Sequence, residues 1–417
     1  MCDCDCGNNI KYGLTVDNDG EFILNGKPFY GYGLNIYSAF QGLLYPEGSV
    51  PYPAGKIYKD DFAMMKRLGL PVARVPFSCW ASQHFKMWMD DPVSYFEKMD
   101  RVVREAEKNE LGIIVSLMWR VEAVSENVGE PIREMGNPNS KIVEVSKKYI
   151  GEVVSRYNDS PAIWMWEIGN EFNLPADLDA KYLGGLDRCY STDDFTGYQS
   201  MMAQHIRTID PYRAITTGNA MVRATAYHLM QRGYGKEDSD TGIWYMPEPS
   251  DYDTLEQYAY MFRRQNPDPI NVCSIHMQHW RENGLTTEEL GGKFVTYLEY
   301  MKESIKAAAE VKKAVYFGEY GDMMEYHALG KHYQDNWDNL VKNYKSIMKD
   351  LVDSDLQLAT EWLVSTVDGH MFSMVNEQGA HHKMLFQIDE LVRINKEFRE
   401  QGKQNTASYW NAVKKYK

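Results

Sequence analysis

The stretch Ile163–Gly169, which reads Ile-Trp-Met-Trp-Glu-Ile-Gly, is the segment that best indicates the fold class. Its apolar residues follow one another without the alternation of apolar and polar positions that marks a strand with one solvated face. Continuous apolar runs of this kind are typical of parallel strands that are buried on both faces. The stretch therefore predicts a parallel strand inside an α/β protein.

Similar short apolar runs recur along the chain, at Tyr30–Ile36, Val72–Pro76, Ile113–Leu117, Ala214–Thr217, Val272–Ile275, Ala314–Gly318 and Ala359–Val364. Most of them are separated by stretches with helix-period apolar positions, at Asp60–Leu68, Ser94–Asn109, Ser140–Tyr157, Tyr198–Ile209, Phe294–Val311, Asn336–Leu351 and Gln387–Gln401. Eight strands alternating with helices predict an α/β fold of the (β/α)8 or TIM barrel type, for which 417 residues is an ordinary length.

Two segments depart from this alternation. Near the N-terminus, Leu14–Val16 and Glu21–Leu24 flank a short polar turn, which predicts a β-hairpin that can floor the closed end of the barrel. The segment Leu229–Pro269 is rich in Gly, Pro, Asp and Tyr and predicts a loop insertion between the fifth and sixth strands, with a short helix at Thr254–Arg264. Because no linker or repeat divides the rest, we expect residues 11–417 to form a single catalytic domain.

The composition excludes several classes of protein. The 45 basic and 59 acidic residues give a formal net charge of −14, and the basic residues form no stripe, so we expect no nucleic-acid partner. No apolar run reaches the length of about 18 residues that a membrane span needs. With 44% hydrophobic and 25% charged residues, the chain is typical of a soluble globular enzyme, and its acidic surface suits a neutral oligo- or polysaccharide.

Residues 1–10 are expected to form a flexible tip, and three of the six cysteines lie within Met1–Gly7. Three interpretations stay open: a disordered tip, a lipoprotein start in which Cys2 carries a lipid anchor, and a Cys-x-Cys-x-Cys metal site. The lipoprotein interpretation agrees with an extracytoplasmic location, whether secreted, periplasmic or on the cell surface. The other cysteines are far apart in sequence and are interpreted as buried thiols.

Two glutamates at the carboxyl ends of predicted strands are the candidate catalytic residues, because barrels of this kind carry their active sites at that end. Glu171 follows the strand Ile163–Gly169, and Glu319 follows the strand Ala314–Gly318. Hydrolysis of a glycosidic bond needs such a pair, since one carboxyl group protonates the departing oxygen while the other attacks or stabilises the anomeric carbon. We therefore expect both glutamates to face one cleft.

The residues around this pair resemble those of a known family. Trp166–Glu171, which reads Trp-Glu-Ile-Gly-Asn-Glu, resembles the Asn-Glu signature of clan A glycoside hydrolases, above all glycoside hydrolase family 5, the cellulase and β-mannanase family. Glu319, in Phe-Gly-Glu-Tyr-Gly, resembles the nucleophile of that family. Further matches follow in strand order at Arg74, His276 and Trp362. The resemblance covers about residues 30 to 365.

This resemblance implies a role for each matching residue. Glu171 would act first as acid and then as base, with a pKa raised by burial and by the neighbouring carboxylate. Glu319 would form the glycosyl-enzyme intermediate, and Arg74 would keep it ionised. Asn170 would hydrogen-bond the sugar 2-OH. The remaining substrate-binding residues would be His276, within the cleft, and Trp362, beneath the sugar at the point of cleavage.

The sequence departs from the family pattern in three places. Where family members commonly carry a His after the third strand, Leu117–Arg120 reads Leu-Met-Trp-Arg. Where they often carry a Tyr two residues after the His of the sixth strand, this chain has Gln278, so His279 or the candidate substrate-binding residue Tyr245 would take its place. The Pro that often follows Asn-Glu is Phe172. These changes affect the expected substrate more than the expected reaction.

Trp119 and Trp280 lie just past predicted strand ends and are further candidate substrate-binding residues, with ordinary packing as the alternative. Glu361 and Glu122 are expected near the rim of the cleft, where they could contact sugar hydroxyls, without a catalytic role. His276 and His279 are spaced i, i+3, but two histidines make a weak metal site, so we expect neither metal nor cofactor.

These observations favour a retaining glycoside hydrolase that acts on β-linked glycans by double displacement, with β-mannan as the first candidate substrate and β-glucan as the next. Two alternatives from other classes stay open. One is a catalytically silent sugar-binding barrel, which has no need for both glutamates. The other is a metal-dependent barrel lyase or isomerase. The sequence does not decide between endo and exo cleavage or fix the oligomeric state.

Overall fold

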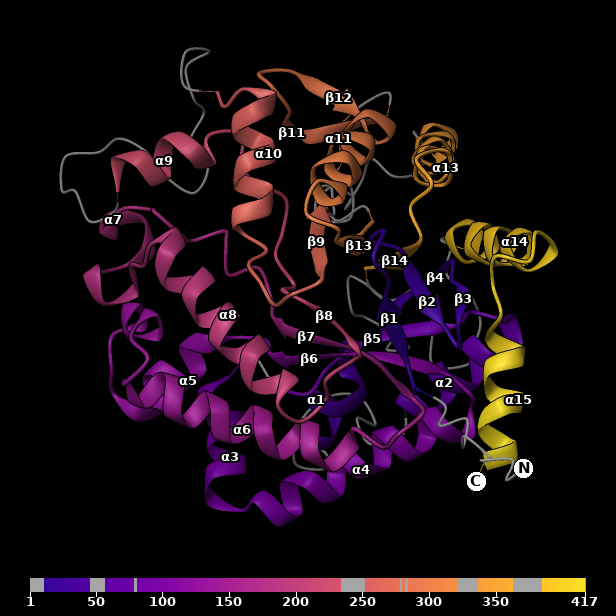
Figure 1. The fold of residues 1–417 in the computed structure, drawn as a ribbon, viewed down its shortest axis with the longest axis horizontal. Helices are drawn as coiled ribbons and strands as arrows, with labels where there is room; N and C mark the ends of the chain where they lie inside the picture. Colours follow the sequence, from indigo (N-terminus) through magenta and orange to yellow (C-terminus); the bar gives the residue numbers. More distant parts are fainter. Residues whose placement is uncertain are drawn as a thin grey trace, which may run out of the picture.

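A closed barrel of eight parallel strands forms the centre of the molecule, as predicted (Figure 1). The computed structural model describes residues 11–45, 57–78, 81–233, 252–277, 280–281, 284–321, 337–362 and 385–416. The barrel strands are β4 (Gly31–Asn35), β5 (Val72–Pro76), β6 (Gly112–Met118), β7 (Ile163–Gly169), β8 (Ala214–Thr216), β9 (Val272–Met277), β13 (Ala314–Tyr320) and β14 (Leu358–Glu361). The barrel closes where Leu358 pairs in parallel with Gly31.

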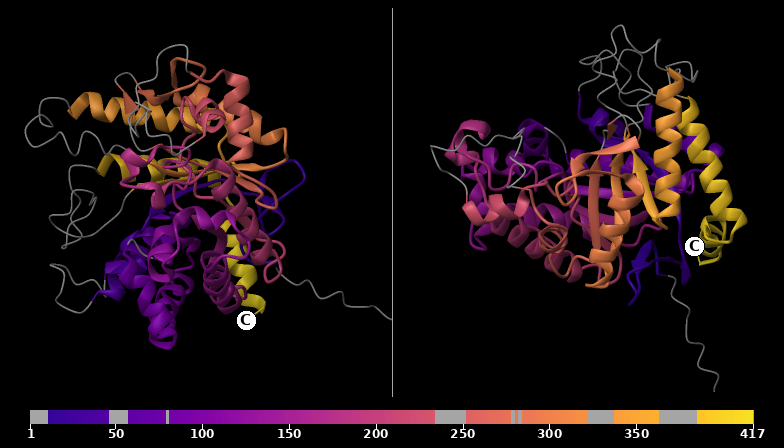
Figure 2. Two further views of the ribbon diagram at one scale, coloured as in Figure 1. Left: turned by 90° about the vertical axis from the view of Figure 1, so that its left-hand side faces the viewer. Right: turned by 90° about the horizontal axis from the view of Figure 1, so that it is seen from above.

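Helices surround the barrel on its outer side (Figures 1 and 2). They are α1 (Ser38–Leu44), α2 (Ile57–Leu68), α3 (Ser82–Asp90), α4 (Pro92–Lys108), α5 (Val121–Val128), α6 (Lys141–Tyr157), α7 (Ala180–Leu183), α8 (Thr192–Arg207), α9 (Ala226–Arg232), α10 (Leu255–Arg264), α11 (Tyr297–Ala309), α13 (Trp337–Asp353), α14 (Leu385–Glu400) and α15 (Thr406–Tyr416). Two short 3-10 helices, η1 (Ile132–Gly136) and η2 (Leu186–Arg188), lie in the loops. The described part of the chain contains no helix with the length and apolar character needed to cross a membrane.

Side-chain caps fix where several helices begin. The Ser140 hydroxyl accepts a hydrogen bond from the backbone N–H of Val143 (3.1 Å), so α6 begins one residue after the predicted start. A capping box between Thr296 and Glu299 starts α11, and the residues before Thr296 form a strand where a helix was predicted. The prediction placed this boundary wrongly because periodicity alone does not detect a cap.

The predicted N-terminal hairpin is present and closes the amino-terminal end of the barrel. It comprises β1 (Leu14–Val16), β2 (Phe22–Leu24) and β3 (Lys27–Pro28). The backbone N–H of Phe22 donates to the side chain of Gln357 (2.8 Å), which immediately precedes β14. On the same end, the hydroxyl of Tyr409 in α15 donates to the carbonyl of Pro161 (2.6 Å), just before β7. The opposite end of the barrel is left for the active site.

A second antiparallel sheet follows β9 and was not predicted. It consists of β10 (Trp280–Arg281), β11 (Leu285–Glu289) and β12 (Phe294–Thr296). The strand Leu-Thr-Thr-Glu-Glu lacks the apolar run used to recognise the barrel strands. The predicted insertion between the fifth and sixth strands contains most of α9 and the predicted helix, which appears as α10.

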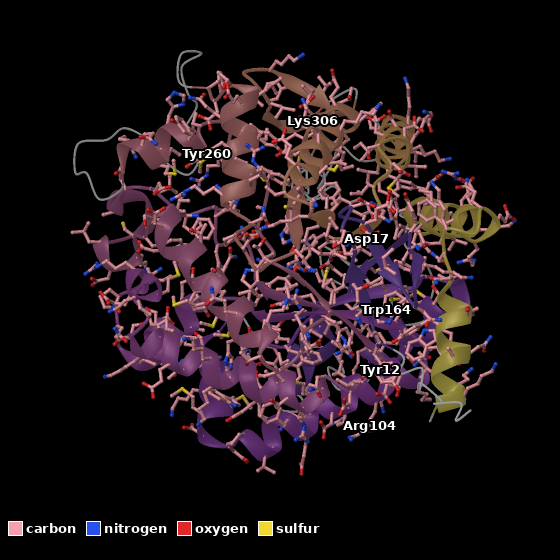
Figure 3. The ribbon with its side chains drawn as sticks, in the orientation of Figure 1. Tyr12, Asp17, Arg104, Trp164, Tyr260 and Lys306 are labelled. Carbon is pink, nitrogen blue, oxygen red and sulfur yellow. The ribbon has the colours of Figure 1, made fainter. Side chains whose placement is uncertain are left out.

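Aromatic side chains fill much of the core. Trp164 is fully buried on β7 and meets the rings of Phe29 and Tyr409 edge-on, with centroids 5.2 and 5.7 Å away. Figure 3 shows Trp164 in the interior, whereas the labelled residues Tyr260 and Lys306 lie on outer helices. Cys189 and Cys273 are buried free thiols, as predicted, whereas Cys79 lies outside the described residues.

Candidate active site

The backbone around Glu171 is held in an unusual conformation. Its φ is +56°, in the left-handed region that non-glycine residues rarely adopt. The backbone N–H of Glu171 donates to the carbonyl of Gly218 (2.7 Å), and its own carbonyl accepts from the N–H of Leu174 (3.0 Å). Gly218, in the loop after β8, also has a positive φ, and a Cβ there would lie 2.9 Å from the side chain of Glu167. This turn projects Glu171 from the carboxyl end of β7.

Glu171 and Glu319 face each other, as predicted. Glu319 is the sixth residue of β13, and its side chain is 2% exposed against 27% for that of Glu171. An oxygen of each carboxyl group and the Nδ1 of His276 lie within 4.8 Å of one another. His276 Nδ1 is 3.3 Å from Glu171 Oε1 and 3.5 Å from Glu319 Oε1. Barrel folding thus brings together three residues that lie on three different strand ends.

The guanidinium of Arg74 connects the polar and charged side chains beneath this pair. It is fully buried, and its Nε donates to both carboxylate oxygens of Glu167, at 2.8 and 3.0 Å. Its Nη1 donates to Glu319 and to Oδ1 of Asn35 (3.0 Å), and its Nη2 donates to Oδ1 of Asn170 (2.8 Å). The prediction that Arg74 lies beside Glu319 is confirmed.

Two residues of this network, Glu167 and Asn35, were not among the predicted site residues. Glu167 belongs to the quoted stretch of β7, where it interrupts an otherwise apolar run. A charged residue in a strand that is buried on both faces signals a buried partner. That signal was present in the sequence. Asn35, at the end of β4, also donates to the carbonyl of Gly318 (2.9 Å) and carried no comparable signal.

Burial raises the pKa of both glutamates, and the neighbouring groups then act on each of them differently. It raises the pKa of Glu171 to about 7, and Arg74 opposes this rise. Burial also raises the pKa of Glu319; His276 and Arg74 act against the rise, while Glu171 adds to it. The predicted effect of a neighbouring carboxylate therefore falls on Glu319 instead of Glu171. The hydrogen bond from Arg74 favours the ionised form of Glu319, and Glu171 has no such bond from this arginine.

His276 is buried, and burial lowers its pKa to about 4, with Glu319 acting in the opposite direction. Its ring is therefore neutral at neutral pH. Together with Glu171 and Glu319 it forms a set of donor atoms that are close enough to hold a metal ion. However, the guanidinium of Arg74 is bonded to Glu319, and this positive charge opposes a cation at the same place.

Aromatic rings line one side of the charged network. Trp119 and Trp362 stack with centroids 6.1 Å apart and planes 22° apart, and Tyr37 contacts both. The guanidinium carbon of Arg74 lies 4.6 Å from the centre of the Trp119 ring. Trp119 is only 1% exposed and covers Arg74, which agrees with the packing alternative and leaves no open face for a sugar. Trp362 is half-buried, and its role as a stacking platform stays a prediction.

Other predicted residues have different outcomes. Glu361 is fully buried, not at the rim, because the hydroxyl of Tyr344 donates to it from α13; burial raises its pKa to about 8. Tyr245, His279 and the N-terminal tip lie outside the described residues, as does the side chain of Trp280, so these predictions stand untested.

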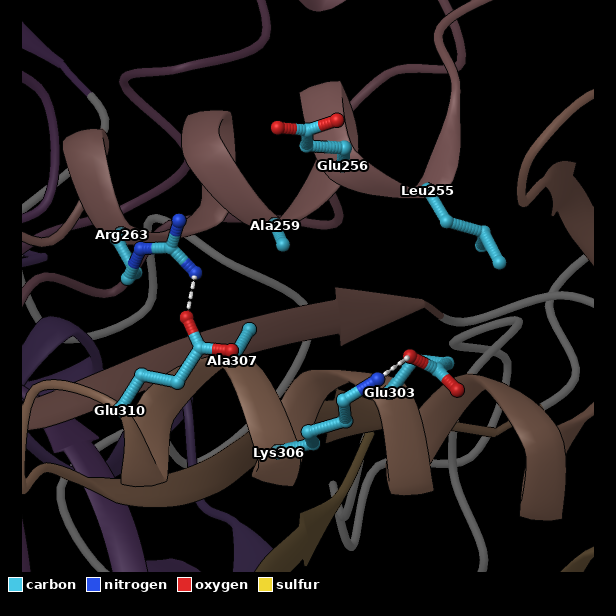
Figure 4. Close-up of a pocket in the computed structure, with 8 residues that line it drawn as sticks. All are labelled: Leu255, Glu256, Ala259, Arg263, Glu303, Lys306, Ala307 and Glu310. Atoms are coloured by element: carbon cyan, nitrogen blue, oxygen red, sulfur yellow. Dashed lines mark hydrogen bonds and ion pairs between the residues drawn. The ribbon is translucent and has the colours of Figure 1, made fainter.

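A groove of about 420 Å³ between α10 and α11 is separate from this site (Figure 4). Arg263 pairs with Glu310 at 2.5 Å, and Lys306 pairs with Glu303 at 3.4 Å. These two ion pairs use four of the five charged side chains that line the groove, and Glu256 is the fifth. None of the lining residues belongs to the network around Arg74.

A barrel with two glutamates that face each other at the carboxyl ends of its strands has the architecture of a glycoside hydrolase. Residues 27–350 match the cellulase family, glycosyl hydrolase family 5. The chain belongs to this family, as its motifs predicted.

Relatives and solved structures agree with this assignment. The chain is 24% identical over 341 residues to mannan endo-1,4-beta-mannosidase 5 of Arabidopsis thaliana, covering 75% of this chain and 69% of the relative. It is 25% identical over 227 residues to a probable mannan endo-1,4-beta-mannosidase C of Aspergillus terreus, covering 50% of this chain and 56% of the relative. The endo-1,4-beta-mannanase structure from Rhizomucor miehei matches with a TM-score of 0.61 at 19% identity, covering 92% of this chain and 99% of that chain.

Proposed function

We propose that this protein is a retaining glycosidase that hydrolyses β-1,4-linked mannan. The observation that carries the proposal is the close approach of Glu171 and Glu319, whose oxygens lie within 4.8 Å. Retaining glycosidases place their two carboxyl groups about 5–5.5 Å apart, whereas inverting ones leave about 6.5–9.5 Å for a water molecule. The contact between Arg74 and Glu319 supports Glu319 as the nucleophile, because the guanidinium favours the ionised form of the carboxylate that it contacts.

In the first step, Glu319 attacks the anomeric carbon and the bond from that carbon to the glycosidic oxygen breaks. Glu171 transfers its proton to the departing oxygen, for which its pKa of about 7 is suited. Arg74 holds Oδ1 of Asn170, which leaves the amide nitrogen of Asn170 as the donor to the sugar 2-OH. The product of this step is a glycosyl ester on Glu319.

In the second step, Glu171 is a carboxylate and accepts a proton from water as the water oxygen bonds to the anomeric carbon. The bond to Glu319 breaks, and Glu319 returns to the carboxylate form. Two inversions at the same carbon give overall retention. Both glutamates end in their initial protonation states.

The mannan assignment is supported by the relatives, whose names describe mannan endo-1,4-beta-mannosidases. β-Glucan is the second candidate, because the structure also resembles a β-glucanase from Saccharophagus degradans, with a TM-score of 0.55 at 13% identity. A panel of manno-, gluco- and xylo-oligosaccharides, with product sizes measured over time, separates these substrates and distinguishes endo from exo cleavage. Preferred cleavage of gluco-oligosaccharides would contradict the mannan assignment.

The chemical proposal is tested by Glu319→Gln, which keeps the shape of the side chain and removes its nucleophilicity. We expect hydrolysis of an activated aryl β-mannoside to fall to background. The matched control is Glu303→Gln, at a glutamate of α11 whose side chain is 37% exposed and pairs with Lys306 at 3.4 Å, away from the active site. Activity near that of the wild type in Glu319→Gln would contradict the assignment.

We further propose that the enzyme acts outside the cytoplasm, because a polysaccharide substrate does not cross a membrane. A lipid anchor on Cys2 would hold it at the surface. Mass spectrometry of the native N-terminus tests this: acylated Cys2 is expected, and an unmodified cysteine would contradict the anchor.

A further inference from the structure

Glu167 is a third buried carboxylate in the active site, and the two-step reaction does not use it. Its side chain is fully buried on β7, four residues before Glu171. Both of its oxygens accept from Nε of Arg74, at 2.8 and 3.0 Å, and its Oε1 also lies 2.7 Å from Nη2. Glu167 thus engages one whole edge of the guanidinium group.

The rest of the guanidinium serves the reacting groups. Its Nη1 donates to Glu319, and its Nη2 donates to Asn170 at 2.8 Å. Because a guanidinium is planar and rigid, a carboxylate that fixes one edge also fixes where the other N–H groups point. The orientation of Glu319 and Asn170 is therefore coupled to Glu167.

Packing leaves Glu167 little freedom. The turn at Gly218 passes so close that a Cβ there would lie 2.9 Å from the carboxyl carbon of Glu167. The carbonyl of the same glycine accepts from the backbone N–H of Glu171. Glu167 therefore lies between the arginine that orients the nucleophile and the turn that carries the acid.

The negative charge of Glu167 has a second effect, on the reactivity of Glu319. Several titratable groups surround Glu319: Arg74 on β5, Glu171 at the end of β7, His276 on β9 and Tyr316 on β13. Below about pH 7 Arg74 is the charged member of this set, and Glu167 shares its charge with Glu319. A guanidinium held by Glu319 alone would stabilise that carboxylate more strongly and make it a weaker nucleophile.

We propose that Glu167 is a positioning residue of this glycosidase: it fixes the plane of Arg74 and shares its charge, and so keeps Glu319 oriented and reactive. This inference rests on the assignment of Glu319 as nucleophile. The alternative is that Glu167 only satisfies a buried arginine and contributes to stability alone.

The variant Glu167→Gln tests the proposal, because it removes the charge and keeps the shape. The matched control is Asp210→Asn, which alters another fully buried ion pair, between Asp210 and Arg213 at 2.6 Å. Asp210 also accepts from Nε1 of Trp166 (2.8 Å) and has no contact with the catalytic pair. Both variants are assayed for melting temperature, kcat, KM and the pH profile of kcat/KM with an activated aryl β-mannoside.

For Glu167→Gln we expect kcat/KM to fall by about 100-fold, mostly through kcat, as is typical when a reacting group loses its orientation. The acidic limb of the pH profile of kcat/KM should move to lower pH. Without the charge of Glu167, Arg74 stabilises the Glu319 carboxylate more strongly, so Glu319 becomes protonated at a lower pH. For Asp210→Asn we expect a lower melting temperature, a kcat within about threefold of the wild type and an unshifted limb.

A Glu167→Gln enzyme with a kcat within about threefold of the wild type, or with an unshifted acidic limb, would overturn the proposal. If this variant does not fold, Glu167→Asp replaces it, since it keeps the charge and shortens the reach. We expect Glu167→Asp to lower kcat without moving the limb, and an unchanged kcat would again overturn the proposal. A wild-type enzyme without activity would instead refute the proposed function.

Discussion

Deprotonation of Glu171 should control the activity of this enzyme above neutral pH. Burial raises the pKa of Glu171 to about 7, and only the protonated acid can assist a poor leaving group. With that pKa, about 90% of the sites hold the proton at pH 6, about 10% at pH 8 and about 1% at pH 9. On a manno-oligosaccharide, kcat/KM should therefore fall about tenfold for each pH unit above 7.

The assay compares two substrates with the same sugar. A manno-oligosaccharide needs protonation of its leaving oxygen, whereas 2,4-dinitrophenyl β-mannoside leaves as a stable phenolate and needs none. The basic limb of kcat/KM should appear with the first substrate and be absent with the second. With Glu171→Gln, we expect the oligosaccharide rate to fall by about 10²–10⁴-fold, the usual contribution of general acid–base catalysis.

The same variant tests the second step. Without its base, the glycosyl-enzyme should accumulate on the dinitrophenyl substrate, and added azide should release it as a β-mannosyl azide. Three results would refute the reasoning: a basic limb above pH 9, the same limb with both substrates, or an α-configured azide product. The variant Glu303→Gln serves again as the control and should keep the wild-type profile.

Three further predictions concern the surrounding structure. Burial raises the pKa of Glu361 to about 8, so its contribution to stability is present at low pH and is lost as the pH rises towards 8. The variant Glu361→Gln should therefore flatten the decline of the melting temperature between about pH 5 and pH 8. An unchanged slope would contradict this. Gly218→Ala should lower the free energy of unfolding in urea by more than the roughly 1–2 kcal/mol that a left-handed backbone costs, and should lower kcat/KM at least about tenfold. The control is Gly402→Ala, which has a similar φ and open space around the added Cβ. It should lose only the backbone energy and keep full activity. Trp119→Phe removes part of the ring that covers Arg74, so kcat/KM should fall about tenfold, in line with about 1–2 kcal/mol for a buried cation–π contact; an unchanged value would show that the ring only fills space.

The proposed catalytic pair was accessible from the sequence because each glutamate lies within two residues of the end of an apolar strand. In a parallel barrel the carboxyl ends of all strands meet at one face, so Glu171 and Glu319 had to converge once the strands were recognised. The hairpin and the helix α10 were likewise predictable from turn residues and periodicity. The ends of helices were harder to predict: α11 begins three residues after the predicted start, because the Thr296 side chain caps it there.

Some features depend on distances that the sequence does not contain. Trp119 lies just past a strand end, as expected, yet it is buried because Trp362 and Arg74 occupy its faces. Glu361 directly precedes Trp362 but is buried, since Tyr344 reaches it from a helix. In both cases a residue near the cleft turns inward because of a partner that is distant in the chain.

The sequence by itself determined the barrel, its order of strands and the two glutamates, because these follow from local periodicity and from the rule that strand ends converge. Only the tertiary structure decided how those glutamates differ. Arg74 donates to Glu319 and not to Glu171, and Glu167 holds the far edge of that arginine. Charge interactions depend on separations of a few ångströms between residues far apart in the chain, and only the folded barrel sets those separations.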